Sequence, residues 1–217
     1  MQTISVIGGT GELGGGLALR WALAGLPVIV GSRDAGRAEA MAAKLNAAAG
    51  NDLARGMGND AAAAAGDIVV LTVKFSHHRA TLEQLKPALA GKVLVDTTVP
   101  LVPPKVARVQ LPPEGSAAVI AQQILGEATH VVSAFQNVSA SSLQYGDGSK
   151  SDVLVTGDNP EARETVVQLA VAAGYKGWHA GPLANSAATE ALTSVLIFIN
   201  KRYKSHDTGI TITGAGN

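Results

Sequence analysis

The stretch Gly8-Gly9-Thr10-Gly11-Glu12-Leu13-Gly14 decides the fold of this 217-residue chain. An apolar run at residues 4–7 precedes it and an alanine- and leucine-rich run follows it, which predicts a strand, a tight turn and the start of a helix. The spacing Gly9-x-Gly11-x-x-Gly14 is that of the dinucleotide-binding fingerprint. We expect Gly9 to allow the turn, Gly11 to let the backbone approach a diphosphate, and Gly14 to bring the helix close to the strand. Amides at the helix N-terminus would then face the anion, whereas the alternative is a purely structural turn.

The end of the next predicted strand, Pro27–Val30, indicates which dinucleotide is bound. NAD-binding proteins usually carry an acidic residue about 20 residues beyond the glycines, where it bonds the ribose 2′-hydroxyl. This chain has Ser32 and Arg33 there, and both side chains can bind a 2′-phosphate. Arg37, one turn into the next predicted helix, points the same way. The pattern predicts NADP(H) rather than NAD(H); the alternative is a solvated arginine pair beside Asp34.

Composition excludes several classes of protein. Hydrophobic residues make up 47% of the chain and charged residues 16%, which suits a buried parallel sheet. Seventeen basic residues balance seventeen acidic ones, which argues against binding to nucleic acid or to a charged membrane surface. The absence of cysteine excludes disulfides, thiol nucleophiles and cysteine-ligated metals, and we expect no metal site. The apolar stretch 195–199 is too short to span a bilayer, so we expect a cytoplasmic protein.

Strand and helix patterns alternate along most of the chain, which predicts an α/β fold. We expect a Rossmann-type, doubly wound, mostly parallel sheet with a small C-terminal α/β extension. The predicted division is an NADP-binding domain at residues 1–157 and an extension at 158–217, unless the two form one compact unit. Residues 100–114, with five prolines, and residues 136–151 are predicted to be irregular.

No constellation of acid, base and nucleophile stands out. His77 and His78 are adjacent and diverge on a helix, so we expect them to be solvated or loosely structural. His179 either approaches a bound ring or is a buried, hydrogen-bonded imidazole. Thr98 follows a predicted strand at residues 92–96, where it either bonds a ring carbonyl or ends the strand. We therefore expect no catalytic side chain, with hydride transfer occurring between stacked rings.

The chain as a whole resembles one family, the NADPH-dependent coenzyme F420 reductases, also called F420H2:NADP+ oxidoreductases. The matching pieces run in family order from end to end. They include the glycine turn, Val30-Gly31-Ser32-Arg33, Val132-Ser133-Ala134-Phe135, Ala180-Gly181-Pro182-Leu183 and Glu190-Ala191-Leu192-Thr193. The resemblance implies hydride transfer between NADP(H) and coenzyme F420, a Rossmann domain with a small C-terminal part, and a homodimer.

The resemblance also implies where each ligand lies. The turn would contact the diphosphate, the end of the second strand the 2′-phosphate, Val73 the nicotinamide, and residues 135–140 the deazaflavin. The cofactor-binding candidates are Gly9, Thr10, Gly11, Glu12, Leu13, Ser32, Arg33, Arg37, Val73, Thr98 and Ala140. The acceptor-side candidates are Lys74, Phe75, Gln136, Asn137, Val138 and Ser186.

The chain departs from the family pattern only on the acceptor side. Many relatives have Pro-Trp in place of Lys74-Phe75, some have His in place of Gln136, and Ser139 replaces a common Pro. These departures leave open a reductase that uses FMN, FAD or another flavin-like ring as acceptor. A non-enzymatic NADP(H)-sensing protein is a second alternative.

Overall fold

A computed structural model describes residues 2–145 and 151–215. The strands are β1 (Ile4–Ile7), β2 (Val28–Ser32), β3 (Ala54–Gly58), β4 (Ile68–Leu71), β5 (Val93–Asp96), β6 (His130–Ser133), β7 (Asp152–Gly157) and β8 (Lys176–His179). The helices are α1 (Glu12–Leu23), α2 (Ala35–Ala49), α3 (Asn59–Ala65), α4 (Phe75–Leu89), α5 (Ala117–Leu125), α6 (Ala140–Tyr145), α7 (Pro160–Ala172) and α8 (Ser186–Tyr203), with a short 3₁₀ turn at Leu183–Asn185 before α8.

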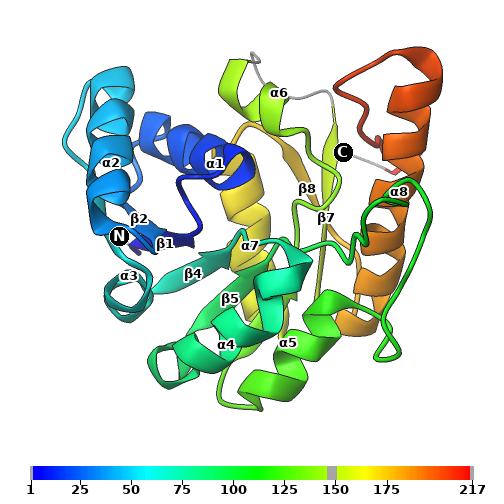
Figure 1. Ribbon diagram of the computed structural model, residues 1–217, viewed down its shortest axis with the longest axis horizontal. Coiled ribbons are helices and arrows are strands. Elements are labelled where there is room, and N and C mark those ends of the chain that lie inside the picture. The colour runs from blue at the N-terminus through cyan, green and yellow to red at the C-terminus, as the bar shows by residue number, and fades with distance from the viewer. Residues whose placement is uncertain (1, 146–150, 216–217) are drawn as a thin grey trace.

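The strands form one eight-stranded sheet in the order β3-β2-β1-β4-β5-β6-β7-β8. All neighbouring pairs are parallel except β6 and β7, which run antiparallel. Strand order reverses at β1, because β2 lies on one side of it and β4 on the other (Figure 1). Ligands of open α/β sheets bind outside the carboxyl ends of the strands at such a point. The predicted doubly wound, mostly parallel sheet is therefore confirmed.

Alternate residues of the inner strands face two separate cores. Ile4 and Val6 of β1 pack on one face with the side chains of α1, α2 and α7, whereas Ile7 packs on the other with α4 and α5. This alternation is the two-residue period of a strand, here buried on both sides. Trp21 of α1 is fully buried in the first core and donates a hydrogen bond to the carbonyl of Leu169 on α7, so α1 and α7 cover the same face (Figure 1).

The C-terminal part contains a strand that the sequence did not reveal. β8 pairs in parallel with β7, with Asp152 opposite Lys176, so the sheet continues beyond the predicted boundary at residue 157. Residues 100–114 form no helix or strand, as predicted, but α6 begins within the segment predicted to be irregular at 136–151. Part of that segment, residues 146–150, lies outside the described residues. No helix in the described ranges is long and apolar enough to cross a bilayer.

Candidate dinucleotide site

The glycine turn links β1 to α1 and lies directly against the end of β4. Gly8 has a φ of 80°, and a Cβ added to it would lie 2.9 Å from the carbonyl oxygen of Thr72. The positive φ of this turn belongs to Gly8. Gly9 is limited by space instead, because an added Cβ would lie 2.9 Å from the carbonyl oxygen of Val6. The φ of 80° at Gly8 is one that only glycine adopts at no steric cost.

Gly14 sets how closely α1 approaches the sheet. A Cβ added there would collide with Oγ1 of Thr72 and lie 2.8 Å from the carbonyl oxygen of Gly8. The helix begins at Glu12, and the preceding residue, Gly11, offers no side chain to cap it. The first amides of a helix have no partner within it, so those of α1 remain available to an anion.

Two arginines follow β2, and the acidic residue between them pairs with neither guanidinium group. The carboxylate of Asp34, between them, accepts a hydrogen bond from the backbone N–H of Arg37 at 3.2 Å and so caps α2. The hydroxyl of Ser32 accepts from the backbone N–H of Asp34. Within the described part of the chain, neither Arg33 nor Arg37 forms an ion pair. Both guanidinium groups are exposed and available to a phosphate.

A cleft of about 630 Å³ joins the glycine turn to these arginines. It brings together six of the predicted cofactor-binding residues from three different strand ends, namely Thr10, Gly11, Ser32, Arg33, Arg37 and Val73. The other residues along it are Gly8, Asp34, Asn59, Thr72, Lys74, His77, Ala80, Thr81 and Gln84. Asp34 is the one acidic side chain among these described lining residues, so the cleft combines unpaired basic side chains with exposed backbone amides.

The remaining cofactor candidates lie outside this cleft. Glu12 lines a separate cavity between α1 and α2, and Leu13 packs against the first core. Thr98 is buried, its backbone N–H donates to Oδ1 of Asp96, and its own hydroxyl has no partner among the described residues. Ala140 begins α6. Contact between these residues and a cofactor stays a prediction.

The acceptor-side candidates beyond β6 are held by hydrogen bonds between distant segments. The side-chain amide of Gln136 donates to the carbonyl of Asp96 and to the hydroxyl of Ser133, both at 2.8 Å. Asn137 donates to the carbonyl of Thr189 and to the hydroxyl of Thr193 on α8. The segment that contains Gln136, Asn137 and the half-buried Val138 is therefore tied to both β5 and α8.

Strain accompanies these bonds at the end of β6. Phe135 has a φ of 71°, a conformation that costs a non-glycine residue of order 1–3 kcal/mol and that clusters at functional sites. Its buried ring packs edge-to-face on Trp21, with ring centroids 6.0 Å apart.

The other two acceptor-side candidates lie at helix starts. Ser186 is fully buried, and its hydroxyl donates to that of Ser116, the N-cap of α5. Phe75, half-buried, begins α4.

A buried polar network underlies the carboxyl ends of β5 and β6. Nε2 of His78 lies 2.6 Å from Oδ2 of Asp96, and both side chains are almost completely buried. The expectation that His78 is solvated or loosely structural was wrong. The signal was in its spacing, because His78, Leu82, Leu85 and Leu89 all lie on the buried face of α4. His77, on the neighbouring face, is exposed and lines the cleft.

Glu190 of α8 adds a carboxylate to this region. It is 1% exposed and accepts hydrogen bonds from the backbone N–H groups of Ala117 and Ala118, at 2.7 and 3.1 Å. Burial raises the pKa of Glu190 to about 8, the charge of Asp96 acts in the same direction, and the two amide hydrogen bonds oppose the rise. Burial dominates because the carboxylate is removed from water almost entirely. Glu190 was not predicted from the sequence to be a functional residue.

His179 is not the buried imidazole that was one of its two predicted roles, and its approach to a bound ring stays a prediction. It is exposed on β8, and its Nε2 lies 2.9 Å from Oε2 of Glu164 on α7. Over the described ranges, no three histidine, aspartate or glutamate side chains gather in an arrangement that could hold a metal ion. The cleft therefore offers backbone amides and basic side chains, a donor set that suits the phosphates of a dinucleotide.

The fold and this cleft define a dinucleotide-binding protein of the Rossmann class. Residues 3–100 match the family model described as NADP oxidoreductase, coenzyme F420-dependent. An F420-dependent NADP reductase of Methanothermobacter thermautotrophicus is 41% identical, with 98% of this chain and 95% of that protein covered. Its counterpart in Methanocaldococcus jannaschii is 40% identical, with 97% of both chains covered. The chain belongs to the family of F420-dependent NADP reductases.

A solved structure from Arthrobacter sp. FB24 shows the same fold. It superposes with a TM-score of 0.81 and covers 98% of this chain, while its whole length is matched. Its sequence identity is 23%, so the likeness concerns the fold alone.

Proposed function

We propose that this protein transfers a hydride between NADP(H) and coenzyme F420. The observation that carries the proposal is the cleft in which the glycine turn faces Arg33 and Arg37, where Asp34, the one acidic residue among the described lining residues, caps α2. The family relatives of about 40% identity are named for F420 and NADP. Those names favour F420 over FMN or FAD, the acceptors left open by Lys74-Phe75 and Gln136.

The described residues supply binding and position. The free amides at the start of α1 bind the diphosphate, and Arg33 and Arg37 bind the 2′-phosphate through charge-assisted hydrogen bonds. NADPH supplies the hydride when bound, and the sheet edge fixes where its ring lies. Direct transfer between two stacked rings depends on proximity and exclusion of water more than on a protein base, in accordance with the lack of any predicted catalytic side chain.

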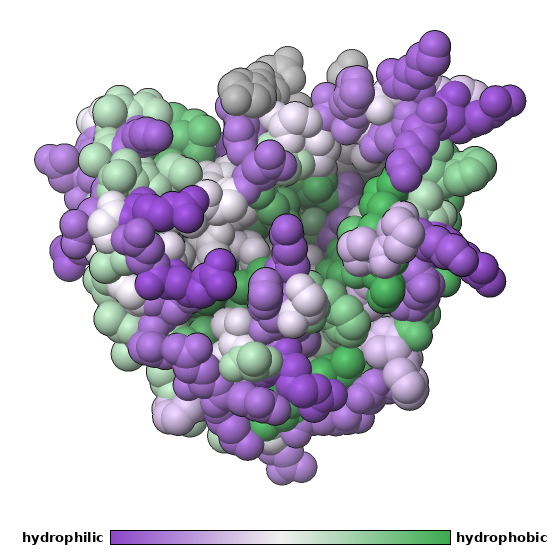
Figure 2. All heavy atoms as spheres, in the orientation of Figure 1, coloured by the Kyte–Doolittle hydropathy of each residue, from purple (hydrophilic) through white to green (hydrophobic). Residues whose placement is uncertain are grey.

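The acceptor belongs on the other side of the sheet edge, between the segment after β6 and the start of α4. Gln136 and Asn137 are fixed there by hydrogen bonds to β5 and α8, and Val138 follows them in the chain. Figure 2 shows this face of the molecule hollowed between α6 and α4, with hydrophobic side chains inside the hollow and hydrophilic ones around it. A flat ring system suits a hollow of that kind.

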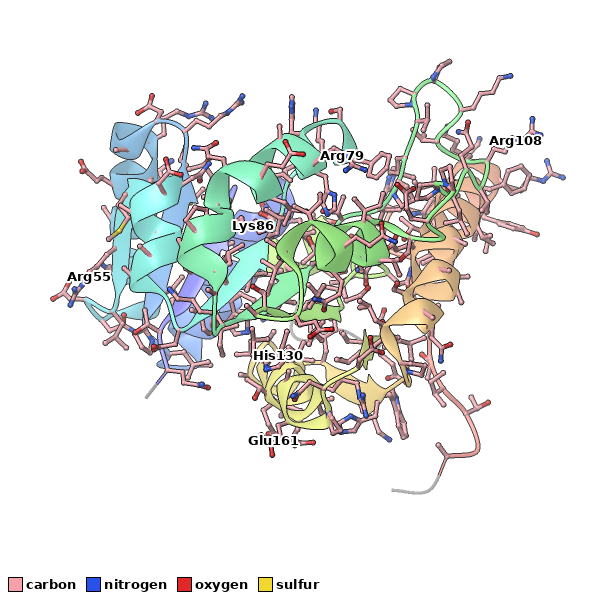
Figure 3. All side chains as sticks on the ribbon, turned by 90° about the horizontal axis from the view of Figure 1, so that it is seen from below. Arg55, Arg79, Lys86, Arg108, His130 and Glu161 are labelled. Carbon is pink, nitrogen blue, oxygen red and sulfur yellow. The ribbon has the colours of Figure 1, made fainter. Side chains whose placement is uncertain are left out.

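A homodimer in the cytoplasm is part of the proposal. α8 leaves Val195, Phe198 and Tyr203 exposed, at 44%, 58% and 75% of their surface. The loop beside it exposes Val102, Val109 and Leu111, and Arg108 extends outward from that loop (Figure 3). Apolar residues gathered on one face mark an interaction surface, and a second copy is the partner we propose. Sedimentation of the wild type and of Phe198→Asp would reveal a dimer that the substitution dissociates.

The decisive test mixes purified protein and NADPH with F420, FMN or FAD in parallel and follows the absorbance of each acceptor. We expect turnover with F420 and little with either flavin. Lack of F420 turnover in both directions would refute the proposal, and turnover with FMN alone would establish the flavin alternative. Tight NADPH binding with no turnover of any acceptor would instead indicate the NADP(H)-sensing protein.

A further inference from the structure

Lys74 lies in the dinucleotide cleft, although the family resemblance places it toward the acceptor. It occupies the N-cap position of α4, two residues beyond Thr72. The backbone N–H and the hydroxyl of Thr72 both donate to the carbonyl of Ile7, at 2.9 and 2.8 Å, and this fixes the end of β4 against β1. Lys74 consequently lines the same cleft as Thr10, Gly11 and Arg33.

The order of the strands separates the basic residues into two walls. β2 and β4 flank β1 on opposite sides, so Arg33 and Arg37 lie beyond one edge of the glycine turn and Lys74 beyond the other. His77, one helical turn after Lys74, lines the cleft from the same wall. The diphosphate cradle formed by the glycine turn therefore lies between the two walls.

The α4 wall carries charge that nothing in the described chain neutralises. Lys74 is exposed and forms no ion pair among the described residues. Asp34, the one acidic residue along the cleft in the described ranges, already caps α2 on the opposite wall. The chain has no net charge, so this local excess of basic groups is a property of the cleft and not of the whole surface.

We propose that Lys74 binds the diphosphate of the dinucleotide from the α4 wall, opposite the arginines that bind the 2′-phosphate. Lys74 is then a determinant of dinucleotide affinity and not of acceptor choice. The inference rests on the proposed function, since it takes the cleft to be the NADP(H) site. It differs from the arginine assignment in one measurable respect, because NADPH and NADH share the diphosphate but only NADPH carries the 2′-phosphate.

The test compares the dissociation constants of NADPH and NADH, from nicotinamide fluorescence, for the wild type, Lys74→Ala and Arg33→Ala. Lys74 is exposed, so its charge-assisted hydrogen bond to phosphate lies at the lower end of the strength that such bonds reach. We expect Lys74→Ala to weaken both nucleotides by about tenfold. Arg33→Ala should weaken NADPH alone. The dependence of log Kd on log salt concentration should also become shallower in Lys74→Ala, because one phosphate contact is lost.

Lys86→Ala is the matched control, since it removes the same charge from the same helix. Nζ of Lys86 donates to the carbonyl of Ile124 on α5, and Figure 3 shows this residue further along α4. We expect both dissociation constants to stay at the wild-type values in this variant. Melting temperatures of all variants establish that each is folded, which we expect because Lys74 and Lys86 are both exposed.

Two results would overturn the inference. One is unchanged affinity of Lys74→Ala for both nucleotides while the wild type binds NADPH. The other is a rise in the KM for F420 with no change in either nucleotide constant, which would return Lys74 to the acceptor side. The binding titration needs no turnover, so a wild type that binds NADPH but does not reduce F420 would refute the proposed function and leave this inference to be decided by the titration.

Discussion

The imidazole of His78 and the carboxylate of Asp96 meet at 2.6 Å with 1% and 0% of their surfaces exposed. His78 lies in the first turns of α4, and Asp96 is the last residue of β5. Oδ1 of the same carboxylate accepts the backbone N–H of Thr98 at 2.9 Å, and the carbonyl of Asp96 accepts from Gln136. One residue therefore connects α4, the end of β5 and the segment after β6, beside the wall of the cleft that carries Lys74.

Asp96→Ala should destabilise the protein by about 3–5 kcal/mol, because the buried imidazole of His78 and the buried backbone N–H of Thr98 both lose the carboxylate that accepts their hydrogen bonds. Urea unfolding followed by circular dichroism would measure the change. Asp52→Ala is the control, since Asp52 is exposed and should contribute less than about 0.5 kcal/mol. A loss no greater than that of the control would show that the pair adds nothing to stability.

Stability should fall between about pH 4.5 and pH 8 through Glu190. The pKa of this buried carboxyl is raised to about 8 in the folded chain, from the ordinary value of 4.5. In that window the folded state retains a proton that the unfolded state has released, so the contribution of Glu190 is complete below the lower value and is lost as the pH rises. The slope from this residue is at most about 1.4 kcal/mol per pH unit.

Glu190→Gln isolates this contribution, because an amide keeps the shape of the side chain and does not titrate. Across unfolding measurements at pH 5, 6, 7 and 8, the wild type should lose stability relative to Glu190→Gln as the pH rises, so that the two curves separate toward high pH. Parallel curves across the whole range would contradict the raised pKa.

Gly14→Ala should weaken both folding and nucleotide binding. The added methyl group would collide with Oγ1 of Thr72 and push α1 away from the turn, at a cost of about 1–3 kcal/mol. Thermal unfolding and NADPH titration would show the two effects. Gly58→Ala is the comparison, because a Cβ there meets nothing within 4 Å and the backbone φ of −61° suits alanine. Equal melting temperatures for the two variants would argue against the close contact.

Arg33→Ala should reduce NADPH affinity by about 10- to 100-fold, the equivalent of one charge-assisted hydrogen bond, and leave NADH affinity almost unchanged. The reason is that the guanidinium group, unpaired in the described structure, faces the cleft where a 2′-phosphate would lie. Isothermal titration with each nucleotide gives the two constants. An equal loss for both would mean that Arg33 does not select the phosphate.

Asn137→Ala should lower kcat with F420 by about 10- to 100-fold while the Kd for NADPH stays constant, because the segment after β6 loses its bonds to Thr189 and Thr193. Stopped-flow measurement of hydride transfer would separate this from product release. Asn51→Ala removes a comparable bond, to the carbonyl of Ala22, at a distance from that segment. If the control lost as much activity, the effect would be general destabilisation.

Local sequence pattern alone was enough to predict the fold and the residues of the cleft that follow β1 and β2. A glycine-rich turn between a strand and a helix, and Ser32-Arg33 at the next strand end, are short-range features whose chemistry depends on neighbours in the chain. β8 escaped detection because its short strand is only half-buried and carries Lys176 and His179 at its ends, so no apolar run marks it. The sequence alone could not show which residue of the turn has a positive φ, because Gly8 and Gly9 stand side by side.

Only the tertiary structure decided which distant side chains meet. His78 and Asp96 are 18 positions apart, and Glu190 reaches amides 73 and 72 positions away; neither distance leaves a periodic signal in the chain. The placement of Lys74 in the dinucleotide cleft depends on β4 lying beside β1, which is a property of strand order and not of the residues around it. Periodicity specifies which face of an element is buried, whereas long-range pairing specifies what lies against that face.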